Sequence, residues 1–236
     1  MESNLWYLVN EMELSFQEIQ KYLVDAMRGL NYLHSQNLCH LDIKPDNILI
    51  DANGAKLCDF GCIAGAYTNN LTYVSDLGMP LKLRPPECCI SLGSDPLIPY
   101  EKGCDLWGFG IMLLELLAYF PLVEVETGEN WHTQVYPVLF KVLQKEEFFK
   151  RVKSVFEDVD DVAVKIALDC VHRFLRKSPY KRMDASVALK HPFFSEKNVA
   201  SFHRMPKDYM WKKTKTATSK IKRCIPRKFK ALRARI

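Results

Sequence analysis

Four polar residues in the first quarter of the chain have the types and the spacing that phosphoryl transfer requires. Asp42, Lys44 and Asn47 share one short polar stretch, and Asp59 follows after two apolar runs. In phosphoryl transfer, one carboxylate orients the attacking hydroxyl and accepts its proton, while an amide oxygen and a second carboxylate hold Mg²⁺ against the phosphates. A nearby lysine can steady the transferred group. This chemistry requires a fold that brings Asp59 back beside the other three residues.

The two apolar runs between these residues predict a β-hairpin. They cover residues 48–50 and 55–58, and Asp-Ala-Asn-Gly at 51–54 joins them. Asp, Asn and Gly tolerate the tight or left-handed backbone of a hairpin turn. A hairpin folds the chain back on itself, so it can deliver Asp59 close to the loop that carries Asp42.

The whole stretch 40–61 resembles the catalytic and metal-binding loops of eukaryotic protein kinases, whose signature is His-Arg-Asp, then Asn, then Asp-Phe-Gly. The resemblance implies that Asp42 is the catalytic carboxylate and that Lys44, two positions later, marks the serine/threonine branch. It also implies ATP and Mg²⁺ as cofactors, with Asn47 and Asp59 as metal ligands on the cofactor side. The alternative is two unrelated loops that carry Asp and Asn by chance, and the joint spacing disfavours it.

The segment before the catalytic stretch contains a strand-like run. Residues 5–9 (Leu-Trp-Tyr-Leu-Val) are apolar and aromatic, a composition typical of strands. With the residues that follow, they resemble the last N-lobe strand and the hinge of a kinase. The resemblance implies that Asn10 is the gatekeeper and that the backbone of Glu11 and Met12 faces the adenine.

A long amphipathic helix is predicted between this run and the catalytic stretch. Ser15 and Glu18 form a capping box, and apolar residues then recur at helical spacing as far as Leu33. This helix resembles the one that leads into the kinase catalytic loop.

Later motifs extend the resemblance over about residues 5–196. A polar segment at 64–82 looks like an activation loop and is followed by a Pro-Pro-Glu motif that ends at Glu87. Asp105 opens an apolar helix and, by the resemblance, hydrogen-bonds the backbone of the catalytic loop. Arg182 resembles the arginine that pairs with the glutamate of that motif, so we expect an ion pair between Arg182 and Glu87.

Two elements of the family do not occur in these 236 residues. There is no Gly-x-Gly-x-x-Gly and no Val-Ala-Ile-Lys-like strand before the catalytic loop, and in the family these cover and grip the ATP phosphates. We therefore predict a mainly α fold, a kinase-like C-lobe with a small β-hairpin at the catalytic and metal loops and with the N-lobe missing. The predicted parts are a remnant of N-lobe strand and hinge at 1–12, the C-lobe at 13–196 and a basic tail at 197–236.

Composition limits the class of protein further. A hydrophobic content of 48% in 236 residues suits one sizeable core. The longest apolar run, 106–123, contains Glu115 and Pro121, which favours a buried core helix over a membrane span. The eight cysteines are scattered without a Cys-x-x-Cys pair, and no apolar signal region follows Met1. We therefore expect reduced thiols and an intracellular protein, cytoplasmic or nuclear.

Basic charge is concentrated at the C-terminal end. From residue 204 onward there are 13 Lys/Arg and one acidic residue, which leaves 20 basic and 27 acidic residues in 1–203. Apolar positions in 229–236 suggest a basic amphipathic helix for anionic membranes or calmodulin, and Cys224 could carry a palmitoyl group. The lysine clusters could instead serve nuclear import or nucleic-acid contact. The alternative to all of these is a solvated, disordered tail.

Together these observations predict a serine/threonine protein kinase that acts on a protein substrate and that is weak or inactive as this chain alone, because its phosphate clamp is incomplete. The alternative is a kinase-like (pseudokinase) interaction module without turnover. All four polar residues of the first motif are present, which favours the enzyme. The strand at 5–9 would have no sheet partner within this chain, so we expect a partner protein or self-association at that edge.

Overall fold

The computed structural model describes residues 3–12, 14–66, 72–73, 83–90, 97–98, 102–118 and 139–195. Its helices are α1 (Leu5–Glu11), α2 (Phe16–Ser35), α3 (Pro86–Ile90), α4 (Lys102–Ala118), α6 (Lys145–Val155), α7 (Asp161–Phe174) and α8 (Ala185–Ala188). Its strands are β1 (Ser3–Asn4), β2 (Leu38–Cys39), β3 (Ile48–Asp51), β4 (Gly54–Leu57), β5 (Ala64–Gly65), β6 (Thr72–Tyr73) and β7 (Leu97–Ile98). Short 3-10 turns include η1 (Pro45–Asn47) and η2 (Phe60–Cys62). The predicted mainly helical class is confirmed.

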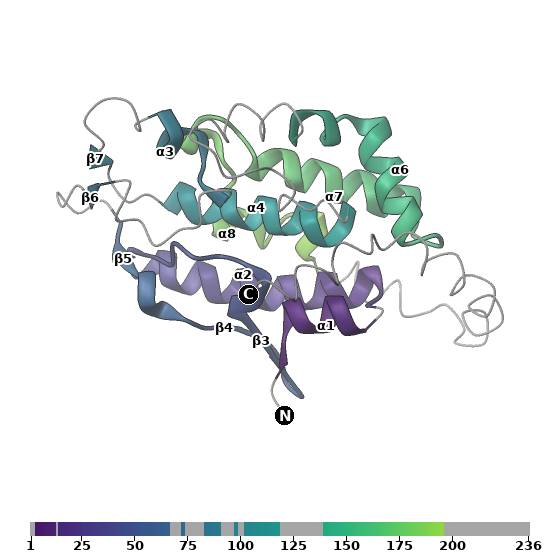
Figure 1. Ribbon diagram of the computed structural model, residues 1–236, viewed down its shortest axis with the longest axis horizontal. Helices are drawn as coiled ribbons and strands as arrows, with labels where there is room; N and C mark the ends of the chain where they lie inside the picture. Colours follow the sequence, from purple (N-terminus) through teal and green to yellow (C-terminus); the bar gives the residue numbers. More distant parts are fainter. Residues whose placement is uncertain are drawn as a thin grey trace, which may run out of the picture. The chain divides into compact units, whose positions relative to one another are not determined.

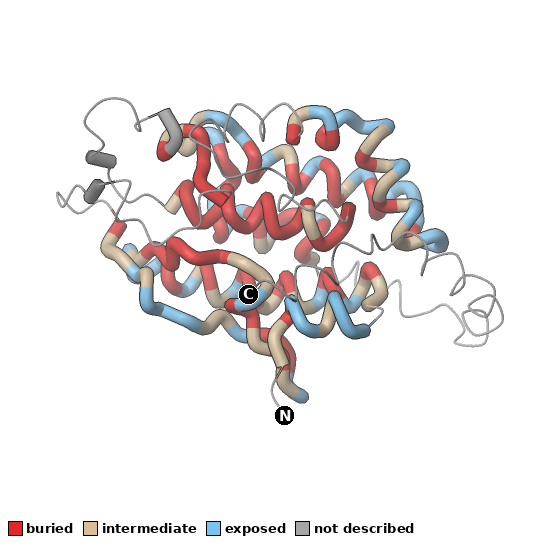
Figure 2. Tube along the Cα trace, viewed as in Figure 1, coloured by how far each residue is buried: buried red, intermediate tan, exposed pale blue. Residues whose placement is uncertain are grey.

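Helix α4 forms the centre of the core. It lies between α2 on one side and α7 on the other, and α6 also packs on it (Figure 1). Its residues are buried from Gly103 to its end, apart from the partly buried Glu115 (Figure 2). A Cβ at Gly110 would lie 2.7 Å from the Cβ of Phe174, so glycine there permits the close approach of α7. The predicted core helix is confirmed over the described part of 106–123.

Among the residues that the structure describes, no helix combines the length and the apolar character that crossing a membrane requires.

Helix α2 starts where the capping box predicts. The Ser15 hydroxyl accepts from the backbone N–H of Glu18 at 3.2 Å, and the Glu18 carboxylate accepts from the backbone N–H of Ser15 at 2.7 Å. The apolar stripe of α2 is buried, from Phe16 and Ile19 to Leu33. Because β4 packs along this helix, α2 supports the hairpin as well as the core (Figure 1).

The predicted β-hairpin is confirmed. Strand β3 pairs antiparallel with β4, with Ile48 opposite Leu57 and Asp51 opposite Gly54 at the turn. Gly54 has φ +128°, which side chains larger than hydrogen rarely allow, and a Cβ there would collide with the Asp25 carboxylate of α2. The same carboxylate accepts from the backbone N–H of Ala55 at 3.2 Å, so α2 and the turn are held together.

The strand predicted at 5–9 is wrong, because these residues form α1. Only Ser3 and Asn4 pair with β3, with Asn4 opposite Leu49. The Asn4 side chain then accepts from the backbone N–H of Tyr7 at 2.8 Å and caps a helix. A helix satisfies its backbone locally, whereas a strand of this length needs a second strand along it. The unpaired strand edge expected at 5–9 therefore does not form, and a partner protein at this end of the chain stays a prediction.

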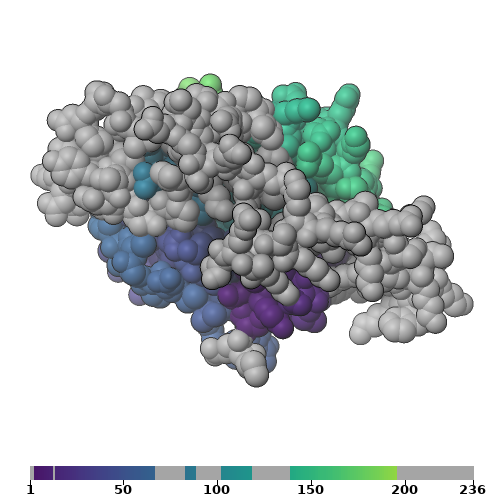
Figure 3. Space-filling model, in the orientation of Figure 1, coloured from purple at the N-terminus to yellow at the C-terminus, as the bar shows by residue number. Residues whose placement is uncertain are grey.

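The exposed surface of α1 nonetheless includes two aromatic side chains. Trp6 is 38% exposed and Tyr7 is 51% exposed, while Leu5 is fully buried. Side chains of α1 reach the molecular surface beside the hairpin (Figure 3).

Several predictions concern residues outside the described ranges. They are the bulk of the expected activation loop at 64–82 and the whole basic tail with Cys224. The start of the loop is described: β5 pairs antiparallel with β2, with Ala64 opposite Cys39.

Candidate active site

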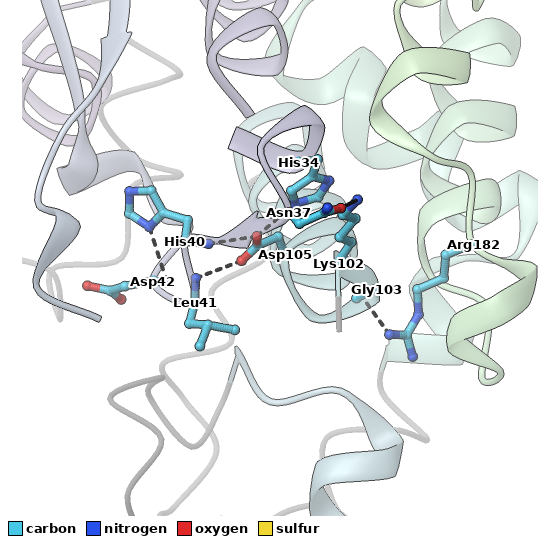
Figure 4. Close-up of polar contacts among 9 residues, drawn as sticks. All are labelled: His34, Asn37, His40, Leu41, Asp42, Lys102, Gly103, Asp105 and Arg182. Carbon is cyan, nitrogen blue, oxygen red and sulfur yellow. Dashed lines mark hydrogen bonds and ion pairs between the residues drawn. The ribbon is translucent and has the colours of Figure 1, made fainter. Parts of the chain in front are cut away.

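Asp105, in the first turn of α4, anchors the backbone of the catalytic loop (Figure 4). Its Oδ2 accepts from the backbone N–H of His40 at 2.8 Å, and its Oδ1 accepts from the N–H of Leu41 at 2.7 Å. The Nε2 of His34 on α2 lies 2.8 Å from the same Oδ2. Asp105 is 1% exposed, so these polar contacts lie in a low-dielectric interior where they are strong. The predicted contact between Asp105 and the loop is confirmed.

Leu41 has a backbone that a branched side chain seldom adopts. Its φ is +64°, in the left-handed region, and its side chain is buried at 2% exposure. Such a conformation costs on the order of 1–3 kcal/mol and persists only where surrounding contacts hold it. The hydrogen bond to Asp105 and the burial of the leucine side chain offset that cost here.

Asp42 lies at the centre of the four polar residues predicted to form the site. We call Asp42, Lys44, Asn47 and Asp59 the quartet. Its Oδ2 accepts from the Lys44 Nζ at 2.7 Å and from the Asn47 Nδ2 at 2.8 Å. The same Nδ2 also donates to the Asp42 backbone carbonyl at 2.8 Å. The other carboxylate oxygen, Oδ1, is buried and has no hydrogen-bond partner. The carboxylate is therefore fixed through one oxygen, which leaves the second free to accept a proton or a hydrogen bond.

The hairpin delivers Asp59 to the same place. At its far end, the backbone N–H of Cys58 donates to the Asn47 carbonyl at 3.0 Å, and the His40 Nε2 lies 3.0 Å from the Cys58 carbonyl. Asp59 itself is left-handed, with φ +60°, and its Oδ1 accepts from the backbone N–H of Gly61 at 3.4 Å. His40 and Asn47, the two ends of the catalytic loop (residues 40–47), thus both contact Cys58, the residue that precedes Asp59.

The charges of Asp42, Lys44 and Asp59 act on the same neighbourhood. Burial lowers the pKa of Lys44, but its hydrogen bond to Asp42 and the negative charges of Asp42, Asp46 and Asp59 outweigh burial and raise the pKa. Lys44 therefore stays protonated. Burial, followed by the charges of Asp42 and Asp59, raises the pKa of the Cys62 thiol, against the opposing effect of Lys44. The thiol stays neutral and within electrostatic reach of both carboxylates.

The donor set suits Mg²⁺ bound together with a nucleotide. Because the Asn47 Nδ2 is spent on Asp42, its amide oxygen is the atom left for a ligand, and Asp59 presents an exposed carboxylate. Within the described ranges, no group of three His, Cys, Asp or Glu side chains could hold a metal ion alone. Mg²⁺ prefers one or two protein oxygens together with phosphates and water, so Asn47 and Asp59 fit that role.

Glu11 and Met12 lie at the C-terminal end of α1. Both are exposed, and the backbone N–H of Met12 already donates to the Leu8 carbonyl at 2.8 Å as the helix cap. Helix α1 packs against η1, the turn that ends in Asn47. The structure therefore brings α1 to the catalytic loop, and a contact between adenine and the backbone of Glu11 or Met12 stays a prediction.

The predicted ion pair between Arg182 and Glu87 is confirmed. The two guanidinium nitrogens donate to the two carboxylate oxygens, each at 2.6 Å. The Arg182 Nη1 also donates to the Gly103 carbonyl of α4 at 2.8 Å (Figure 4), and the guanidinium lies 5.0 Å from the ring centre of Trp107. A bidentate, stacked arginine of this kind fixes α3 to the start of α4.

Two contributors to the site were not found from the sequence. His34 lies on the periodic helix α2, and nothing in its local pattern distinguishes it from other polar positions on that helix. Lys102, whose Nζ donates to the Asn37 side chain at 2.9 Å, ties the start of α4 to the turn after α2. Both contacts join residues more than sixty positions apart.

Comparisons with known proteins agree with this geometry. The family model described as "Protein kinase domain" matches residues 1–194. Mitogen-activated protein kinase PMK1 of Pyricularia oryzae is 28% identical over 213 residues, which cover 82% of this chain and 58% of that protein. Mitogen-activated protein kinase spk1 of Schizosaccharomyces pombe is 29% identical over 223 residues, covering 86% and 56%. Glycogen synthase kinase 1 of Pyricularia oryzae is 30% identical over 194 residues, covering 76% and 47%. The chain thus spans little more than half the length of these relatives, or less.

Proposed function

Because this chain belongs to the protein kinase domain family, we propose that it supplies the protein-substrate half of a serine/threonine kinase site, with Asp42 as the catalytic residue. The observation that carries the proposal is the asymmetry of the Asp42 carboxylate. Lys44 and Asn47 occupy its Oδ2, whereas the buried Oδ1 is unpartnered. An oxygen held in this way can orient a serine or threonine hydroxyl and accept its proton.

Each of the other residues has a defined task in this proposal. Lys44, kept protonated by its acidic neighbours, stabilises the charge that develops on the transferred group. Asn47 orients Asp42 through its amide nitrogen and, with Asp59, would hold Mg²⁺ through oxygen atoms. When bound, Mg²⁺–ATP supplies the phosphoryl group and the neutralising charge. Asp42 would accept the hydroxyl proton, and the bound nucleotide would give up its terminal phosphoryl group to the hydroxyl oxygen and leave as ADP.

We further propose that the phosphate-gripping elements come from outside these 236 residues. The sequence has no glycine-rich loop and no strand lysine ahead of Asp42. Apolar side chains beside the site, including Phe60 at 48% and Met12 at 56% exposure, have the character of a surface that another lobe covers. Catalysis by positioning and electrostatics depends on all of the phosphate contacts, so this chain alone should transfer phosphate poorly.

The test joins the N-lobe of a mitogen-activated protein kinase ahead of Leu5 and measures transfer of labelled phosphate to serine and tyrosine peptides. We expect activity on the serine peptide to appear in the fusion and to be negligible in the chain alone. Asp42→Asn should reduce the activity of the fusion by about a thousandfold, since a positioned base contributes on the order of 10²–10⁴. Asp46→Asn is the matched control because Asp46 is exposed and contributes only its charge.

Two results would contradict the proposal. A fusion that stays active after the Asp42→Asn substitution would remove Asp42 from catalysis. A correctly folded fusion without activity would instead favour the non-catalytic interaction module.

A further inference from the structure

A shallow groove runs along α7, away from the catalytic quartet. Its first part, a hollow of about 490 Å³, lies between α7 and the segment 183–192, and aliphatic residues line it: Val162, Ile166, Met183, Val187 and Pro192. Its second part, a hollow of about 320 Å³, lies towards the start of α6 and is lined by Lys145, Leu168, His172 and Arg176. Lys165 and Asp169 line both hollows, so we treat the two as one surface, the α7 groove.

The apolar part of the α7 groove is open to solvent. Val162 is 59% exposed and Val187 is 49% exposed, among the most exposed large aliphatic side chains of the described residues. Each lies on a different helix, Val162 on α7 and Val187 on α8. Covering both with one apolar ligand would remove this surface from water, which is favourable in proportion to its area.

The basic part of the groove has exposed cations, of which Lys165 lies within electrostatic reach of Asp161. Lys145, Lys165, Arg176 and Lys190 are all exposed, and their side chains make no hydrogen bond or ion pair within the described residues.

Asp169 is the acidic residue of the groove lining, and its carboxylate already has hydrogen-bond partners within the protein. Its Oδ2 accepts from the Arg173 Nε at 2.8 Å and lies 2.9 Å from the His191 Nε2. Burial raises the pKa of Asp169, but these two hydrogen bonds outweigh burial and lower it. The carboxylate stays ionised and is neutralised locally, so the groove keeps an excess of positive charge.

We propose that the α7 groove docks an acidic peptide segment of a partner protein, with apolar side chains against Val162 and Val187 and acidic side chains beside Lys165 and Arg176. Charge complementarity selects the acidic residues, and the aliphatic hollow next to the cations selects an apolar run beside them. A nucleic acid would also satisfy the cations, but it gains little from an aliphatic hollow and usually stacks its bases on aromatic side chains. The lining of the two hollows contains no Phe, Tyr or Trp ring.

The test uses the full chain and a fluorescent peptide that carries a run of leucines followed by a run of glutamates. Fluorescence anisotropy at about 0.15 M salt, where the screening length is about 8 Å, measures its affinity. We expect Lys165→Glu with Lys190→Glu to weaken binding by about tenfold, since each reversed contact replaces attraction with repulsion. Val187→Asp should weaken it independently, through the apolar part.

The basic tail makes a matched control necessary. Lys212→Glu with Lys213→Glu changes the net charge by the same amount in the basic tail. We expect it to change the affinity by less than about twofold, because the groove is intact. Hydrogen exchange of the backbone should slow in α7 when the peptide is added. Equal loss in both double variants would show a non-specific charge effect and overturn the proposal.

Two further results would also overturn it. A peptide with serines in place of the leucines that binds equally well would show that the hollow contributes nothing. An oligonucleotide that binds more tightly than the peptide, with loss in Lys165→Glu, would assign the surface to nucleic acid.

Discussion

The two sides of the candidate site differ in how completely this chain surrounds them. On the catalytic side, Asp105 is 1% exposed and binds two backbone N–H groups of the loop, while Asp42 is 6% exposed. On the metal side, Asp59 is exposed and Phe60 is 48% exposed, and the centre of the Phe60 ring lies 5.4 Å from that of His40. Among the described residues, Asp42 and Asp105 are therefore enclosed, whereas Asp59 and Phe60 are open to solvent.

The largest effect should come from breaking the closed side. We expect Asp105→Ala to lower the free energy of unfolding by about 4 kcal/mol, because it leaves buried N–H groups of His40 and Leu41 unpaired, at about 1–3 kcal/mol each. Urea denaturation followed by tryptophan fluorescence measures this. Asp161→Ala, which removes a solvent-exposed pair with Lys153, is the control and should have far less effect. Equal losses in both variants would show that Asp105 is not the anchor.

A smaller difference is expected between a phenylalanine of the buried core and Phe60 on the metal side. Phe148 of α6 is fully buried, so Phe148→Ala should cost about 3–5 kcal/mol of stability. Phe60→Ala should cost about 1 kcal/mol, since the ring is half exposed and gains only part of the roughly 1.5–3 kcal/mol of full burial. Thermal unfolding of both variants tests this. A cost for Phe60→Ala as large as that for Phe148→Ala would mean that something in the chain already covers the metal side.

The smallest effect concerns the pH dependence of Lys44. Its pKa is raised in the folded protein above the ordinary value of 10.5. A raised pKa of a base contributes stability that is fully present below the unfolded pKa and is lost as the pH rises through the folded pKa. We therefore expect the stability difference between wild type and Lys44→Met to be constant below about pH 10 and to shrink above it. A difference that grows with pH would show that the lysine is not held by its acidic neighbours.

Local patterns predicted the elements on which this comparison depends. The capping box at Ser15, the hairpin turn that ends at Gly54 and the apolar run of α4 each specify their structure within a few residues. The pairing of Arg182 with Glu87 joins residues 95 positions apart, and it was predictable only through resemblance to a family. The family motifs supplied information about contacts between distant residues, which local periodicity does not contain.

The failures have physical causes too. Leu-Trp-Tyr-Leu-Val has strand composition, but α1 forms because the edge of β3 is taken by two residues and Asn4 caps a helix directly after them. Propensity is a weak prior when the tertiary partner is absent. The left-handed backbone of Leu41 and the role of His34 depend on Asp105, a residue that no local window around them contains.

The separation between the catalytic loop and its anchor has a consequence for the order in which the site forms. Asp42, Asn47 and Asp59 belong to one hairpin and its flanking loop, a local structure that can form in about 1–10 μs. Asp105 follows His40 by 65 positions, so at about 5–20 residues per second it leaves the ribosome roughly 3–13 s later. The quartet is thus synthesised well before the residue that fixes it, and pulsed proteolysis of nascent chains should find the loop cleavable until α4 has emerged. The residues of the site are therefore synthesised early, but the site becomes ordered late in folding.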